Sequence, residues 1–186
     1  MQHMKRQGAV GTRQRGFTLV EMIAVVAGIA LLAILVSVDW DPAKTQATVA
    51  IDFQRSISMR VKEYRAETGC FPAALDALWD KTQNTTSSCG VDLTGKWRPY
   101  MERQPVDAGT AGHPVILDNV FTGLRGTLFT SGTPTQYHIR LTGVPNPMAD
   151  KMMTICNGST TGTGNCAKSA GAGTTSIIDF YVGQDA

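Results

Sequence analysis

The sequence lacks the motifs of the common catalytic and metal-binding sites. It contains no Cys-x-x-Cys pair, and neither His113 nor His138 has a ligand partner at helical spacing, which disfavours a zinc site. No G-x-S-x-G elbow is present, and the serines in loops have no convincing base and acid partner. We therefore expect no catalytic residue, no metal and no cofactor, and we expect that the protein is not an enzyme.

A positive charge excess is also missing once the N-terminus is set aside. The 186 residues have a formal net charge of +2, but residues 1–16 carry four basic side chains and no acidic one. The remaining side chains therefore sum to −2, which argues against a broad nucleic-acid-binding surface. Only a local basic patch formed by Arg140, Lys151 and Lys168 would favour nucleic acid, so we do not expect it as a partner.

Charged residues are absent from Met22 to Val38. The apolar segment Phe17–Val38 has 22 residues, enough for a helix to cross about 30 Å of hydrocarbon. Its one charged residue, Glu21, is a functional-site candidate because an ionised side chain in lipid is costly. The most economical partner is the α-amino group that a cut after Gly16 would create on Phe17 of a neighbouring copy. Alternatively, Glu21 lies at headgroup depth and is hydrated there.

The order of these features differs from that of an ordinary secretory leader, whose apolar stretch precedes its cleavage site. Here the apolar stretch follows Gly16, so removal of the basic leader would leave the anchor attached to the exported part. An uncleaved signal anchor of another periplasmic protein is the alternative, but it leaves Gly16 and Glu21 unexplained.

The run Gly16-Phe17-Thr18-Leu19-Val20-Glu21, with its basic leader and its apolar helix, resembles the processing site of type IV pilins and type II secretion pseudopilins. The resemblance implies that a prepilin peptidase cuts between Gly16 and Phe17 and methylates Phe17. It also implies that Glu21 directs assembly into a filament through the apolar helix.

The same resemblance implies three regions and a location. Residues 1–16 would be the removed leader, residues 17–38 the transmembrane and filament-core helix, and residues 39–186 the exported globular domain. The subunit would be stored in the bacterial inner membrane with its N-terminus in the cytoplasm. It would then enter an extracellular pilus or a periplasmic pseudopilus, with copies of itself or related pilins and the assembly platform as partners.

The resulting hypothesis is a structural subunit of a type IV pilus that serves adhesion, motility or DNA uptake. A type II secretion pseudopilin is the alternative within the family, and a minor pilin acting as an adhesin or DNA-binding module is the alternative of another class. Two further segments are similar to the family, Gly69-Cys70-Phe71-Pro72 after Tyr64 and the run from Trp97 to Tyr100.

Four cysteines, all in the exported part, indicate two disulfides in an oxidising compartment, although four cysteines allow three pairings. We predict that sequence neighbours pair, Cys70 with Cys89 and Cys156 with Cys166. The Gly/Thr-rich loop between the second pair resembles the disulfide-bounded variable loop of many pilins.

Periodicity predicts an α+β domain with one long N-terminal helix packed on an antiparallel sheet. The helix is expected to continue past Asp39, with a bend or brief break near Pro42, and to end at Gly69. Its upper half is amphipathic, with an apolar stripe at Ala47, Ala50, Phe53, Ile57, Val61 and Tyr64.

The rest of the chain alternates between predicted helices, strands and loops. Short helices are expected at 71–81 and 145–155, and a low-complexity loop at 158–173. The predicted strands are 114–121, 124–130, 137–141 and 176–182.

Overall fold

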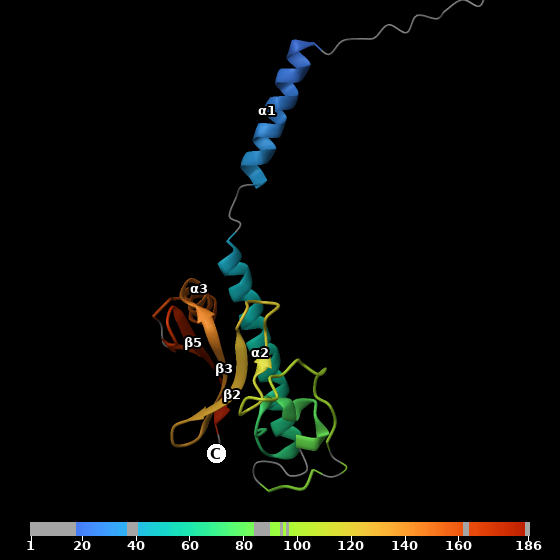
Figure 1. Cartoon of the computed structure of the whole chain (residues 1–186), viewed down its shortest axis with the longest axis vertical. Coiled ribbons are helices and arrows are strands. Elements are labelled where there is room, and N and C mark those ends of the chain that lie inside the picture. The colour runs from blue at the N-terminus through green and yellow to red at the C-terminus, as the bar shows by residue number, and fades with distance from the viewer. Residues whose placement is uncertain are drawn as a thin grey trace, which may run out of the picture. The chain divides into compact units, whose positions relative to one another are not determined.

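The computed structural model describes residues 18–36, 41–83, 90–93, 95, 97–161 and 164–184. The chain divides at Asp41 into two compact units. The described part of the first unit contains one helix, and the second unit is an α+β domain (Figure 1).

Helix α1 (Leu19–Val36) has 18 residues and continues through Gly28 without interruption. Large apolar side chains from Leu19 to Leu32 are exposed around the helix. Among the described residues, no helix is long and apolar enough to cross a membrane. The predicted span 17–38 includes residues 17, 37 and 38, which lie outside the described part of the chain.

Helix α2 (Pro42–Thr68) begins and ends where its capping residues require. The Lys44 N–H donates to Asp41 Oδ1 over 3.2 Å, which satisfies one of the free amides at the helix start. At the other end, Gly69 adopts φ +80° and donates its N–H to the Arg65 carbonyl. Glycine adopts this left-handed conformation without the clash that a Cβ atom causes, so the helix stops there.

The long N-terminal helix, which the sequence predicted with a bend or brief break near Pro42, is not confirmed. The structure has two helices, α1 and α2, and residues 37–40 between them lie outside the described residues. The predicted amphipathic stripe of α2 is confirmed at five of its six positions, and Phe53 is half-buried. Further buried residues on this face are Ile51, Gln54, Ser58 and Thr68.

Five antiparallel strands form one sheet in the order β1-β2-β3-β5-β4. The strands are β1 (Val115–Ile116), β2 (Arg125–Ser131), β3 (Gln136–Pro145), β4 (Cys166–Ala170) and β5 (Thr175–Gln184). Helix α3 (Asn146–Asn157) follows β3, and α2 lies alongside the sheet (Figure 1). Side chains of both helices and of the central strands form the core, including Ile57, Tyr64, Ile139, Leu141, Met152 and Ile178.

Two predicted strands and the predicted helix 145–155 are confirmed, and the strand 137–141 is longer than expected. The strand predicted at 114–121 is wrong beyond Ile116. The Val120 and Phe121 N–H groups donate to the Leu117 carbonyl, and Asp118 accepts from the Gly123 N–H, so this segment is a turn.

Two further predictions need correction. The helix expected at 71–81 is reduced to two short 3-10 turns, Leu75–Leu78 and Lys81–Gln83, because the Trp79 and Asp80 N–H groups both donate to the Asp76 carbonyl and close the turn. The loop expected at 158–173 contains β4, whose alanine, serine and lysine residues give only a weak strand signal.

Candidate functional site

Of the predicted site residues, the structure describes Glu21 at the start of α1, Cys70 just after α2, and the pair Cys156 and Cys166. Gly16 and Phe17 lie outside the described residues, so their processing stays a prediction. Glu21 is described, and it lies in the first turn of α1.

Glu21 and Thr18 form a reciprocal capping interaction at the start of α1. The Thr18 N–H donates to Glu21 Oε2 over 2.9 Å, and the Thr18 hydroxyl lies 3.1 Å from the same oxygen. The Glu21 N–H in turn lies 3.3 Å from Thr18 Oγ1. Two backbone amides that no helical carbonyl can reach are thereby satisfied, as in a capping box.

This arrangement gives Glu21 a local partner that sequence reasoning missed. The spacing Thr-x-x-Glu before an apolar run was the signal that would have found it. Only Oε2 is used, and among the described residues no hydrogen bond or ion pair involves Oε1. The carboxylate can therefore cap its own helix and still accept a bond from a second donor.

The remainder of α1 exposes apolar surface beside this carboxylate. Leu19 and Val20 are 76% and 73% exposed, and a shallow groove of about 520 Å³ runs along Leu19, Ile23 and Ala27. Apolar surface in water costs about 25 cal/mol per Å², and contiguous exposed patches mark interaction sites. An apolar partner such as lipid or another helix suits this surface.

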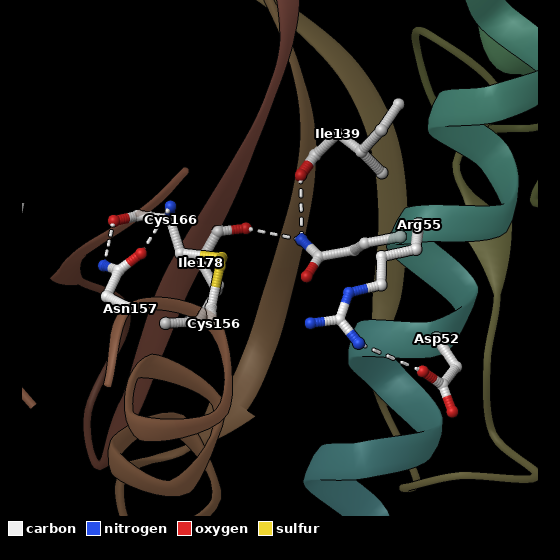
Figure 2. The surroundings of a disulfide bond; sticks show 8 residues. Asp52, Arg55, Ile139, Cys156, Asn157, Cys166 and Ile178 are labelled. Atoms are coloured by element: carbon white, nitrogen blue, oxygen red, sulfur yellow. Dashed lines mark hydrogen bonds and ion pairs between the residues drawn. A yellow bond between two sulfur atoms is a disulfide. The ribbon is translucent and has the colours of Figure 1, made fainter. Parts of the chain in front are cut away.

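The disulfide Cys156–Cys166 is present and confirms one predicted pairing. It joins the last turn of α3 to the first residue of β4 (Figure 2). Cys70 is also disulfide-bonded, but its predicted partner Cys89 lies outside the described residues, so that pairing stays a prediction.

Asn157 reinforces the same junction. Its side-chain amide donates to the Cys166 carbonyl over 2.7 Å, and its Oδ1 accepts from the Cys166 N–H over 3.1 Å. Figure 2 shows both bonds beside the sulfur atoms. The carboxamide pairs with Cys166 as the peptide group of a neighbouring strand would.

The three cations that would form a local basic patch are each paired with a carboxylate. Arg140 makes two bonds of 2.7 and 2.8 Å to Asp179, and Lys168 lies 2.6 Å from Asp150. Lys151 lies 3.1 Å from Asp41. The bond from Lys151 is the largest cause that lowers the pKa of the Asp41 carboxyl.

Neither of the two described histidines lies in a catalytic constellation. His113 Nδ1 contacts the buried Asp76 carboxylate at 2.5 Å. His138 Nε2 lies 3.1 Å from the Ser131 hydroxyl on the neighbouring strand, and partial burial lowers the pKa of the His138 imidazole. Within the described residues no cluster of three or more metal-ligating side chains occurs.

The segment from Trp97 to Tyr100 has a structural role. Trp97 Nε1 donates to the Ala77 carbonyl over 3.1 Å, and the Tyr100 hydroxyl donates to Glu67 over 2.8 Å. Burial and this neighbouring carboxylate raise the pKa of Tyr100. The segment thus fastens the Leu75–Leu78 turn to the end of α2.

Comparison with protein-family models, with curated proteins and with solved structures finds no match for this chain. The resemblance to pilins therefore depends on the sequence alone, mainly on the residues around Gly16 and the apolar segment after them.

Proposed function

We propose that this chain is the structural subunit of a type IV pilus filament. In this proposal a prepilin peptidase cuts after Gly16 and methylates Phe17, and residues 17–38 hold the subunit in the inner membrane. The observation that carries the proposal is the run Gly16 to Glu21 followed by a helix whose apolar side chains are exposed on all sides. Many such helices packed around one axis would bury these side chains.

The geometry at Thr18 and Glu21 supports a specific assembly contact. The capping bonds hold the carboxylate at the helix start and engage Oε2. The methylated amine of Phe17 on a neighbouring subunit would bind Oε1. Because an unpaired carboxylate in an apolar surrounding is costly, this contact would set the axial register of one subunit on the next.

A type II secretion pseudopilin is the second candidate. The Trp97–Tyr100 segment favours it, since segments of this kind also occur in pseudopilins and here it fastens a turn to α2. A DNA-binding minor pilin receives less support, because Arg140, Lys151 and Lys168 are each neutralised by a carboxylate.

The test separates the charge of Glu21 from its capping role. Gln is also accepted at the third position of a capping box, so Glu21→Gln keeps the helix start and removes the charge. We expect leader removal to continue in this variant while filaments disappear. Thr18→Ala removes the two bonds of the Thr18 hydroxyl and keeps both the backbone bond to Glu21 and the carboxylate, so it should still assemble. Electron microscopy of sheared fibres and mass spectrometry of their N-terminus give both readouts.

Two results would contradict the proposal. One is normal filaments from Glu21→Gln, and the other is a native chain that still begins with its basic leader. Recovery of the chain as the dominant species of surface fibres, starting at methylated Phe17, would favour a pilus over a pseudopilus.

A further inference from the structure

The two edges of the sheet differ in how they are protected. At one edge β1 has only two residues, and Val106 forms a bridge with Val115 beside it. At the other edge β4 has five residues and, within the described part of the chain, pairs only with β5. An unprotected edge strand presents a row of backbone donors and acceptors to another chain.

The hydrogen bonds around β4 show which residues present those groups. The Cys166 N–H and C=O bond to Asn157 on the outer side, whereas Asn165 and Gly171 bond to β5 through Tyr181 and Thr175. Residues of an antiparallel strand alternate between the two sides. The N–H and C=O groups of Lys168 and Ala170 therefore point outward. Among the described residues no backbone hydrogen bond reaches these outward groups.

A groove of about 930 Å³ runs along this edge, between β4 and α3. One wall is a single face of α3, with Asn146, Asp150 and Met153 at steps of four and three residues. Lysine side chains often protect strand edges, but the Lys168 ammonium lies 2.6 Å from Asp150 in an ion pair. This pair makes the wall electrically neutral, and it holds the lysine side chain against α3 and not over the free edge of β4.

We propose that this groove binds an extended peptide segment of a partner protein, which adds to the sheet as a further strand beside β4. Main-chain bonds to Lys168 and Ala170 would provide the affinity, and the face of α3 would select the side chains. Asn157 already pairs with Cys166 as such a strand would. Because the exposed Ala170 is apolar and the Asp150–Lys168 pair is neutral, the segment is expected to be uncharged and partly apolar.

A second copy of the chain fits this edge less well. Two β4 strands paired about Ser169 would join only Lys168 and Ala170 of each copy, because Asn157 covers Cys166. Such a contact is small beside the roughly 1,200 Å² that specific interfaces bury. A single peptide strand, by contrast, would occupy the groove and would contact α3 as well. The proposal is independent of assembly through α1.

The test uses the full chain in detergent and a fluorescein-labelled peptide that copies Thr175–Gln184 with asparagine in place of Asp179, so that its side chains are uncharged. The sequence of this peptide is already complementary to β4, since Ile178 pairs with Lys168 and Ser176 with Ala170. We expect saturable binding in a fluorescence anisotropy titration. Backbone amide NMR signals of Lys168 and Ala170 should shift more than that of Ser169, whose N–H points to β5.

Ala170→Pro is the decisive variant. It removes an outward N–H and leaves the bonds between β4 and β5 in place, so the fold should tolerate it. Binding should weaken at least about tenfold, while the matched Ala170→Ser should bind as the parent does. The amide shifts of the unchanged chain test the same claim if Ala170→Pro does not fold.

Three outcomes would overturn the proposal. They are absence of peptide binding, equal binding by Ala170→Pro and Ala170→Ser, and amide shifts confined to other parts of the chain. Self-association that Ala170→Pro abolishes would assign the edge to a second copy instead.

Discussion

Helices α1 and α2 are both rich in aliphatic residues, yet only α2 buries an apolar stripe within its own unit. In α2 the buried positions recur every three or four residues, and exposed polar residues lie between them. In α1 the apolar residues occupy every side, and Ile29 is 61% exposed whereas Ile57 of α2 is fully buried. A stripe can be covered by one sheet face. A helix that is apolar on all sides needs neighbours all around it.

The first prediction tests this difference in burial with one substitution in each helix. Ile57→Ala should lower the free energy of unfolding by about 2–5 kcal/mol, because it opens a cavity in the core. Ile29→Ala should change it by less than about 0.5 kcal/mol, because the side chain is largely exposed. Urea denaturation of the full chain in detergent, followed by circular dichroism, measures both. Equal effects of the two substitutions would refute the distinction.

The second prediction concerns α3, against which α2 packs. The disulfide between Cys156 and Cys166 closes a loop with a sequence separation of 10. Replacing both cysteines with alanine should lower the free energy of unfolding by about 2–4 kcal/mol, because the unfolded chain regains conformational entropy. Chemical denaturation of the oxidised parent and the double variant tests this. An unchanged midpoint would mean that Asn157 and the core hold the junction without the covalent bond.

The third prediction tests Gln54, a fully buried polar side chain of α2 that reaches the sheet. Gln54 Nε2 donates to the carbonyls of Ile139 and Ile178 over 2.9 and 3.3 Å. Gln54 Oε1 has no partner within the described residues. Gln54→Met keeps the side-chain volume and removes the Nε2 donor and the Oε1 acceptor together. The free energy of unfolding should therefore fall by only about 1 kcal/mol. Thr48→Ala, on the exposed side of α2, is the control and should be near neutral in the same denaturation assay.

The sequence was most informative where one physical signal dominated. Apolar periodicity and the stop signal at Gly69 located the amphipathic helix α2, and β-branched and aromatic residues located β2 and β5. It was less informative where contacts between distant residues decide the structure. Strand β4 has small, weakly strand-forming residues, and it is held by β5, by the disulfide and by Asn157.

The candidate site divides in the same way. The sequence singles out Glu21 as a candidate because it is one carboxylate in an apolar run, but its bonds to Thr18 required the helix geometry. The pairing of Arg140 with Asp179 joins residues on two different strands, and no spacing in the sequence indicates it.

The last prediction compares the first turns of the two helices, since each begins with a carboxylate that accepts a backbone N–H. Asp41 also has a cation, Lys151, and this partner, followed by the Lys44 N–H, lowers the pKa of Asp41. Because the pKa of Asp41 is lower in the folded state, the ionised carboxylate stabilises the folded protein fully at a pH above the unfolded pKa of about 3.9. This stabilisation is lost as the pH falls through the folded pKa.

Asp41→Asn keeps a capping oxygen and removes the ion pair. The parent should therefore melt at a slightly higher temperature than Asp41→Asn at neutral pH, and the two should converge in acid. The difference is expected to be small because both partners are partly exposed. Lys151→Met should give the same convergence, whereas a difference that persists in acid would assign the effect to capping alone. Glu21, by contrast, has no cationic partner among the described residues, and in the proposed filament the Phe17 amine of a neighbouring subunit would supply one.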